Sequence, residues 1–174
     1  NSDAQLVPGA VPNMVQFLDA NPAAGIASVC LAFPDGRPQF CYGSFPSLYN
    51  EFRSLFGLHR WDLSFWGKLD APREVDWVSG ACLMARKTML DQIGLLDENF
   101  FMFGEEVDLC YRAVQAGWKV CLVPSPPVIH VRAGSAGKTS DRILRLYWGK
   151  LRCFQKHLGK PRSRLLVVMI MASP

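Results

Sequence analysis

The stretch that decides the fold is residues 104–123, which read GEEVDLCYRAVQAGWKVCLV. Its first turn is acidic and Gly117 lies just past its last helical position, as the helix dipole and the glycine C-cap favour. A helix is therefore predicted from about Glu105 to Ala116. The apolar run from Trp118 to Val123 then predicts a strand, which Pro124 ends. A helix that leads directly into a strand indicates an α/β domain.

The sequence on either side continues this alternation of helices and strands. Residues 44–73 are the exception, because they are rich in aromatic side chains and fit either a partly helical surface segment, which we favour, or core residues around a loop. The other predicted elements are a helix over residues 9–21, a strand from Gly25 to Phe33 with a return strand from Gln39 to Tyr42, strands over Val75–Val78, Cys82–Ala85 and Val128–Val131, a helix from Lys87 to Ile93, and a basic amphipathic helix from about Asp141 to His157.

Burial within these elements follows from residue spacing. His59 and His157 lie in polar surroundings and are predicted at the surface. In the 105–116 helix, the apolar residues at helical spacing are predicted to form the buried stripe. They are Val107, Cys110, Tyr111 and Val114.

Length, composition and charge limit which kinds of protein and partner are possible. At 174 residues, 49% of them hydrophobic and 20% charged, the chain is long enough for one domain with a core, and a folded chain is expected between its ends. The net charge of +4 is modest, and much of it lies after His130, where only Asp141 opposes the cations. This local charge indicates phosphate groups or an anionic membrane surface as partner, and not a nucleic acid. The cations are Arg132, Lys138, Arg142, Arg145, Lys150, Arg152, Lys156, Lys160, Arg162 and Arg164.

The six cysteines form no C-x-x-C pair, so a structural zinc site is not predicted. We interpret them as small buried residues in a reducing, cytoplasmic compartment, although Cys30 and Cys41 flank a turn and could face each other. The apolar run 165–171 is too short to span a bilayer. It could form a final helix, an interfacial segment or the start of a longer apolar element, and both ends of the chain resemble truncation points.

Three carboxylates stand within four residues at the predicted helix start: Glu105, Glu106 and Asp108. One interpretation is structural, since an acidic first turn is favourable and Asp108 can pair with Arg112 four residues on. The other is catalytic. A desolvated carboxylate beside an aromatic-rich loop can have a raised pKa and can take a proton from a sugar hydroxyl.

Two further features could bind phosphate or metal. His130 ends an apolar strand, where ligands bind in α/β folds, so it is either a core histidine or a ligand of a divalent metal or pyrophosphate. Residues 132–139 read RAGSAGKT, which ends like a P-loop but has Arg132 where that motif needs glycine. The segment remains a candidate diphosphate clamp or a solvated loop.

Together these segments resemble the family-two inverting glycosyltransferases of GT-A fold, and within them the bacterial rhamnosyltransferase-like enzymes that build cell-surface polysaccharide. The resemblance covers roughly residues 1–160. It implies a Rossmann-like mixed sheet, a nucleoside-diphosphate sugar donor such as dTDP-rhamnose or a UDP-sugar, a carbohydrate or lipid-linked acceptor, and Mg²⁺ or Mn²⁺. The matching segments are Val75–Cys82, Gly94–Phe101, Glu105–Arg112, Gly117-Trp118, Pro124 and His130.

The resemblance also implies roles for individual residues. The catalytic base is Glu106 or Glu105, with Glu106 favoured at the position where the family usually has Asp. Asp3 falls where a DxD-like carboxylate holds the metal, with His130 nearby, but Gln5 leaves only one acidic residue of that motif. The cations of the 132–142 loop, Arg132, Lys138 and Arg142, are expected at the diphosphate, and the residues implied at the donor sugar and acceptor are Trp77, Ser79, Gly80 and Asp108.

The domain organisation expected from the resemblance has two parts. Residues 1–140 form the acceptor-binding, catalytic half of a GT-A domain, and residues 141–174 form a basic amphipathic helix and an apolar tail. A nucleotide-binding half of roughly ninety residues would precede residue 1, in line with the size of a βαβαβ unit. We therefore expect the 174 residues to be inactive alone, and the complete protein to be cytoplasmic at the inner face of the membrane.

Two other functions stay open at this point. The chain could be a non-catalytic sugar-binding, nucleotide-binding or scaffold domain of the same fold. It could also be a phosphate-loop nucleotidase or kinase that uses Gly137-Lys138-Thr139, although Arg132 argues against that function.

Overall fold

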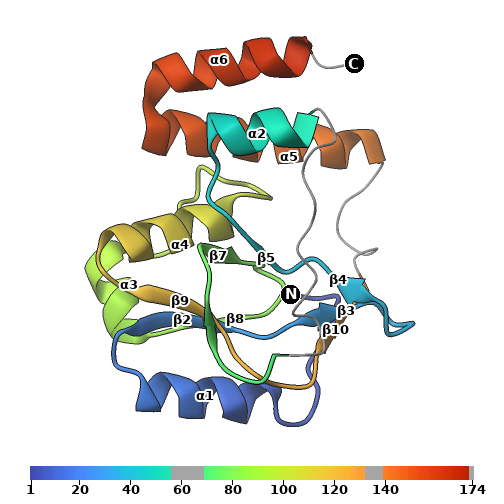
Figure 1. Cartoon of the computed structure of the whole chain (residues 1–174), viewed down its shortest axis with the longest axis vertical. Helices are drawn as coiled ribbons and strands as arrows, with labels where there is room; N and C mark the ends of the chain where they lie inside the picture. The colour runs from blue at the N-terminus through green and yellow to red at the C-terminus, as the bar shows by residue number, and fades with distance from the viewer. Residues whose placement is uncertain (56–68, 132–138, 173–174) are drawn as a thin grey trace.

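The computed structural model describes residues 1–55, 69–131 and 139–172 (Figure 1). Its helices are α1 (Ala10–Ala20), α2 (Leu48–Leu55), α3 (Lys87–Ile93), α4 (Glu105–Gln115), α5 (Thr139–Cys153) and α6 (Gly159–Met171), with a π-helical turn, η1 (Phe154–Leu158), between the last two. Its strands are β1 (Ala4–Gln5), β2 (Ala24–Ser28), β3 (Leu31–Ala32), β4 (Pro38–Gln39), β5 (Tyr42–Gly43), β6 (Arg73–Glu74), β7 (Trp77–Val78), β8 (Leu83–Ala85), β9 (Lys119–Leu122) and β10 (Val128–His130).

A central parallel pairing joins the two larger sheets. β2 runs parallel to β9 and β3 parallel to β10, and backbone bonds from Val123 N–H to Ser28 O (2.8 Å) and from Val128 N–H to Cys30 O (2.9 Å) continue the pairing between them. The strand orders are β6-β9-β2-β8 and β1-β10-β3-β4, and the outer pairings are antiparallel. A third, antiparallel pair joins β5 to β7. The mixed sheets confirm the predicted α/β class.

The predicted strand boundaries are partly wrong. The single strand expected from Gly25 to Phe33 is two strands, because the chain leaves the β9 pairing at residue 28 and resumes with β10 at residue 31. The return strand is Pro38–Gln39, whereas Tyr42 pairs with Val78. Of the expected strand Val75–Val78, only Trp77–Val78 forms a strand, paired with β5, while Val75 donates its N–H to Val120 O at 2.9 Å beside the β6–β9 pairing. Each break marks a change of pairing partner.

The helices form layers on both sides of the sheets (Figure 1). α1 packs against one face of β2, and α3 and α4 cover the opposite face. A further layer of α2, α5 and α6 lies beyond α4. The main buried cluster, which includes Met14, Ile26, Leu109 and Val120, fills the space between α1, the sheets and α4. α4 is therefore enclosed from two sides.

This enclosure changes which residues of α4 are buried. The helix itself is confirmed, but the stripe predicted from apolar spacing is partly wrong because Val114 is 37% exposed. The sheets cover Leu109 and Ala113, while the α5–η1 segment covers Asp108. The fully buried residues of α4 are Asp108, Leu109, Cys110 and Ala113.

The C-terminal segment reverses direction at Gly159. The basic helix predicted from Asp141 to His157 is α5 with η1, and the apolar run then forms α6. Across the described residues, no helix is both long and apolar enough to cross a bilayer. All six cysteines are free and buried, as predicted. The thiols of Cys30 and Cys41 do face each other, and their hydrogen bond, together with burial, raises the pKa of Cys41.

Candidate active site

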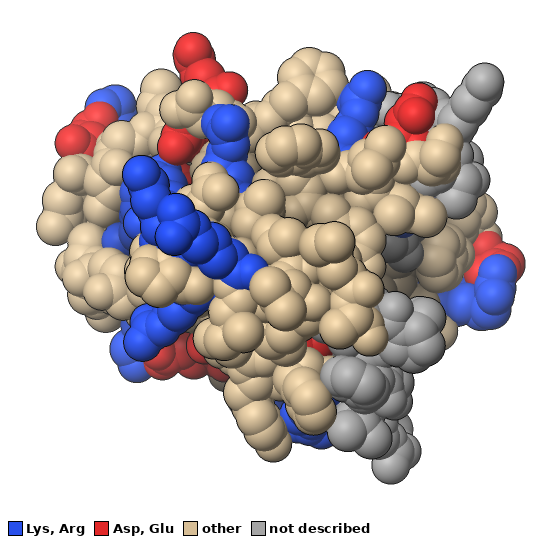
Figure 2. Space-filling model, turned by 90° about the horizontal axis from the view of Figure 1, so that it is seen from above, with Lys and Arg blue, Asp and Glu red and all other residues tan. Residues whose placement is uncertain are grey.

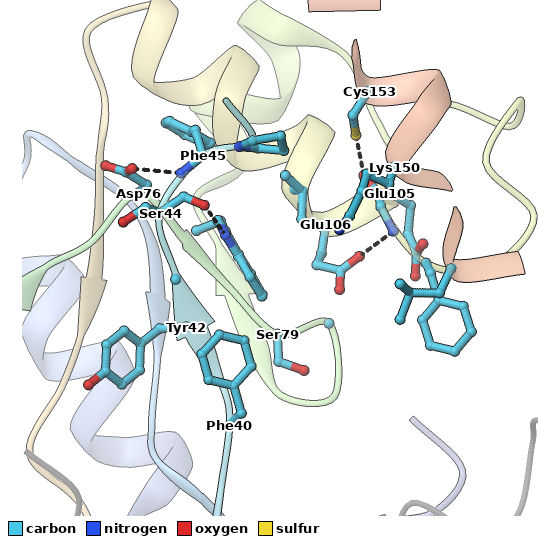
Figure 3. A pocket seen from close by; sticks show the side chains of 18 of the residues that line it. Phe40, Tyr42, Ser44, Phe45, Asp76, Ser79, Glu105, Glu106, Lys150 and Cys153 are labelled. Atoms are coloured by element: carbon cyan, nitrogen blue, oxygen red, sulfur yellow. Dashed lines mark hydrogen bonds between the residues drawn. The ribbon is translucent and has the colours of Figure 1, made fainter. Parts of the chain in front are cut away.

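A cavity of about 970 Å³ opens between the β5–β7 pair, the start of α4 and the inner side of α5 (Figure 3). Figure 3 shows Glu105 and Glu106 beside this cavity, with Phe40 on one side and Lys150 of α5 on the other. Asp3 and His130 line the same cavity. The predicted metal ligands and the predicted base therefore face one space.

The carboxylate pair is placed by a tight turn before α4. Phe103 and Gly104 both have positive φ (69° and 94°), a conformation that costs a non-glycine residue energy, and they turn the chain into the helix. The N–H of Gly104 donates to Glu106 Oε2 at 3.1 Å. Glu105 Oε2 is buried without a hydrogen-bond partner among the described residues. Such an oxygen is available to a ligand in the cavity.

The environment of Glu106 suits a general base. Burial raises its pKa to about 7, and the neighbouring charge of Glu105 adds to the rise, while backbone N–H groups at the helix start oppose it. A carboxylate with a pKa near neutral is partly ionised at neutral pH and has a high enough proton affinity to accept the proton of a hydroxyl. The helix start thus combines a desolvated base with a second carboxylate.

His130 is oriented by the buried Gln39. The Gln39 Nε2–H donates to the carbonyl oxygen of His130 at 3.0 Å, so its Oε1 must face His130 Nδ1, 2.5 Å away. Nδ1 therefore carries the proton of this contact. The other ring nitrogen, Nε2, lies 3.3 Å from Asp3 Oδ1. The antiparallel pairing of Ala4 with His130 brings Asp3 to this position.

Asp3 and His130 fit a divalent cation as a partial ligand set. Asp3 Oδ1 is buried and makes no hydrogen bond within the described part of the chain, and a neutral Nε2 opposite it would also offer a lone pair. Two such groups face each other stably only around a proton or a metal ion. No group of three or more His, Cys, Asp or Glu suited to a metal occurs in residues 1–55, 69–131 and 139–172. Phosphate oxygens would have to complete the coordination, as is usual for Mg²⁺.

Trp77, Ser79 and Gly80 line the cavity beside the carboxylates. Trp77 donates its Nε1–H to Ser44 O at 2.9 Å and meets the ring of Phe40 edge-on, with centroids 5.5 Å apart. A Cβ on Gly80 would lie 3.6 Å from the Cβ of Glu106, so this backbone passes close to the predicted base. An aromatic wall beside a carboxylate pair suits a sugar, which offers both apolar ring faces and hydroxyls.

Asp108 does not line the cavity, contrary to the role that the resemblance implies. It is fully buried and accepts from Arg112 at 2.8 Å, Lys156 at 2.7 Å and His157 at 2.7 Å. Burial opposes its ionisation, but the hydrogen bonds from His157, Lys156 and Arg112 outweigh that effect and lower its pKa to about 2. It has no surface left for a substrate.

His157 was predicted at the surface and is instead packed against Asp108, with a side chain only 12% exposed. Its polar sequence neighbours predicted an exposed position, whereas the His157 side chain points toward α4. Arg142, one of three predicted diphosphate contacts, lines the cavity. The other two, Arg132 and Lys138, lie outside the described residues, as does His59.

Sequence reasoning missed several residues of the site. Gln39, Phe40 and Lys150 line the cavity, and Lys150 pairs with Glu51 of α2 at 2.6 Å. The polar Gln39 within an otherwise apolar hairpin was the one available signal, because a buried amide needs partners. The others depend on contacts between segments far apart in the chain.

Comparison with known proteins agrees with this geometry. The family described as "Glycosyltransferase like family 2" matches residues 2–149. The chain is similar to the N-acetylglucosaminyl-diphospho-decaprenol L-rhamnosyltransferase of Mycobacterium tuberculosis, with 32% identity over 150 residues, 79% of this chain and 47% of that protein. The chain thus spans about half the length of this relative.

Two shorter similarities point the same way. The low-salt glycan biosynthesis hexosyltransferase Agl10 of Haloferax volcanii is 45% identical over 47 residues, 27% of this chain and 15% of that protein. The rhamnosyltransferase WbbL of Escherichia coli is 34% identical over 56 residues, 32% of this chain and 21% of that protein. The mixed sheets are consistent with a GT-A-type domain, and the family match covers most of the chain. The chain belongs to the family-2 glycosyltransferases.

Proposed function

We propose that the complete protein transfers a sugar, rhamnose or another hexose, from a nucleoside-diphosphate donor to a cell-surface glycan acceptor with inversion at the anomeric carbon. The observation that carries this proposal is one cavity faced by Glu105 and Glu106 on one side and by Asp3 and His130 on another. A base and a diphosphate-binding pair in one space are what a single displacement needs.

In this mechanism, Glu106 accepts the proton of an acceptor hydroxyl, and that oxygen forms a bond to the anomeric carbon. The bond between this carbon and the diphosphate oxygen breaks, and the nucleoside diphosphate leaves from the opposite face. Asp3 and His130 would hold Mg²⁺ or Mn²⁺, which supplies positive charge at the leaving diphosphate. Arg142 lines the cavity and would add a cation there, with Arg132 and Lys138 as further candidates from the sequence.

Names of relatives suggest the substrates. The mycobacterial relative is named for a rhamnosyl transfer to a decaprenol-linked diphosphate sugar, and WbbL is named a rhamnosyltransferase. dTDP-rhamnose is therefore the first donor to test, a UDP-sugar the second, and a lipid-linked diphosphate sugar the first acceptor. The aromatic wall of Trp77 and Phe40 would contact the sugar rings.

The full-length protein is expected to transfer rhamnose to a lipid-linked diphosphate sugar only in the presence of a divalent cation. The measurement is product formation from radiolabelled donor after EDTA treatment, with and without added Mn²⁺, followed by NMR of the new anomeric centre. Transfer that persists in EDTA would remove the metal from the proposal. A product with the donor's own anomeric configuration would exclude single displacement, and absence of transfer from either donor class would refute the proposed activity.

We also propose that α6 docks on the anionic inner face of the cell membrane, where a lipid-linked acceptor would lie. Leu165, Val168 and Met171 follow each other at helical spacing and are 48%, 60% and 81% exposed. The view onto this end of the molecule shows Lys and Arg gathered next to a broad surface of uncharged residues (Figure 2). Apolar side chains beside cations fit a surface of anionic lipids.

The full-length protein should therefore co-sediment with vesicles that contain phosphatidylglycerol, and binding should fall as salt is added. Val168→Asp is expected to weaken this binding by roughly tenfold, since it replaces an inserted apolar group by a charge that anionic lipids repel. Val15→Asp is the matched control, because Val15 is 41% exposed on α1 at the opposite end of the molecule. Equal loss in both variants, or equal binding to neutral vesicles, would contradict membrane docking by α6.

A further inference from the structure

The C-terminal half of α5 contacts the Phe103–Gly104 turn, which positions Glu105 and Glu106. The last residues of this helix lie beyond residue 149, where the family match ends. Gly149 lies directly against the backbone of this turn. A Cβ built on Gly149 would come 2.0 Å from the carbonyl oxygen of Phe103 and 2.8 Å from its carbonyl carbon. No side chain fits there, so glycine is required for α5 to approach the turn this closely.

The next turn of α5 holds the same loop by hydrogen bonds. The Cys153 Sγ–H donates to the carbonyl oxygen of Gly104 at 3.6 Å. Arg152 donates from Nη1 to the carbonyl oxygen of Asn99 at 2.5 Å. These contacts fix the residues immediately before Glu105 from the side of α5.

The η1 turn then fixes the body of α4. Lys156 bridges two carboxylates, Asp97 in the loop and Asp108 in the helix, at 2.7 Å each. His157 contacts the same Asp108 and lies against the ring of Tyr111, with centroids 4.2 Å apart. The segment thus binds the loop before α4 and the first turns of α4 at once.

We propose that residues Gly149–His157 position the catalytic carboxylates, so that Gly149, Cys153, Lys156 and His157 are positioning residues of the transferase. This proposal rests on the proposed function and deepens it, because it assigns a role in catalysis to a segment that lies mostly beyond the family match. The segment touches no reacting atom in this role. It acts through the Phe103–Gly104 turn and through Asp108.

A shift of this turn would change the chemistry of Glu106 as well as its place. The Gly104 N–H stabilises the ionised form of Glu106, so its loss would make the carboxylate hold its proton more tightly. The other ionisable groups packed around it would stay: Glu105 and Cys110 on α4, and Cys153 and Lys150, the latter paired with Glu51, on α5 and α2. A displaced turn should therefore reveal itself in the pH dependence of turnover.

The test compares Gly149→Ala with Trp148→Ala in the full-length enzyme. Alanine favours helices more than glycine does, so if α5 could move away from the turn without consequence for the site, helix stability would be unchanged or higher and turnover would be unchanged. We expect Gly149→Ala instead to lower kcat roughly 100-fold, as a misplacement of about 1 Å can. The donor KM should stay near the wild-type value, and the acidic limb of the kcat–pH profile should move to higher pH. Trp148 is 67% exposed, and its replacement should leave kcat and the profile unchanged.

A second substitution covers the case in which Gly149→Ala does not fold. Lys156→Met should lower kcat with little change in the donor KM, and Lys156→Arg should restore most of it by keeping both ion pairs. Lys87→Met is the charge-matched control, since Lys87 pairs with Asp91 on the exposed side of α3. A folded Gly149→Ala with wild-type kcat and an unmoved acidic limb would overturn the positioning role, as would equal kcat in Lys156→Met and Lys87→Met. Failure of the proposed transferase function can be told apart from failure of the positioning role, because the wild-type protein itself would then show no transfer.

Discussion

Glu106→Gln in the full-length protein is expected to lower kcat by roughly 10²–10⁴-fold, the usual contribution of a general base. Glutamine has nearly the same shape but cannot accept the proton of the acceptor hydroxyl. It can still face the Gly104 N–H with its amide oxygen, so the turn should hold. Donor binding should be almost unchanged, because Asp3 and His130 contact a different part of the cavity. Initial rates and calorimetric donor titration measure the two quantities separately.

The pH dependence of kcat is a second test of Glu106 as the base. The base must be ionised to act, and burial together with the charge of Glu105 raises the pKa of Glu106 to about 7. Wild-type kcat should therefore rise with pH through about 7 and level off above it, and Glu106→Gln should lack this limb. Glu105→Gln is the comparison, since it removes the neighbouring charge and should move the limb to lower pH. Full activity in Glu106→Gln would transfer the role of base to Glu105, and full activity in both variants would exclude this mechanism.

Local signals in the sequence were enough to place the carboxylate pair. An acidic first turn, an aromatic-rich loop before it and Gly117 after it all concern residues within one helix length, and they predicted α4 within one residue. The pairing of Asp3 with His130 could not be predicted in this way. It depends on β1 joining the sheet beside β10, across more than 120 residues of chain. Only the resemblance to a family linked the two residues beforehand.

The errors on burial around α4 share a physical cause. Apolar spacing predicts that a helix has one buried face, whereas α4 is buried against the sheets and also beneath α5 and η1. The second burial is polar, because the Asp108 carboxylate there pairs with Arg112 and Lys156. A charged residue at a buried position looks exposed to any pattern based on hydrophobicity. His157 was misplaced for that reason, whereas the substrate role expected of Asp108 came from the resemblance to the family.

Asp108→Asn is expected to destabilise the protein by about 3 kcal/mol, the lower end of the cost of removing one partner from a buried ion pair. The amide keeps the shape of the side chain, so the loss measures charge and not volume. Arg112 and Lys156 keep some contact with water, which is why the lower end applies. Asp91→Asn is the matched control, because Asp91 forms an i,i+4 pair with Lys87 that is largely exposed. That substitution should cost no more than about 0.5 kcal/mol.

The pH dependence of this difference tests its origin. The folded-state pKa of Asp108 is lowered from 3.8 to about 2, so its contribution is fully present above pH about 4. It is lost as pH falls through about 2, where the carboxylate is protonated in the folded state as well. Urea unfolding of wild type and Asp108→Asn should therefore differ by a constant amount between pH 5 and 7, by the linkage relation, and by a shrinking amount as pH falls below about 4. Equal stabilities of Asp108→Asn and Asp91→Asn at pH 7 would show that the α5–η1 segment is held by packing alone, and the charges around Asp108 would then have no part in placing α4.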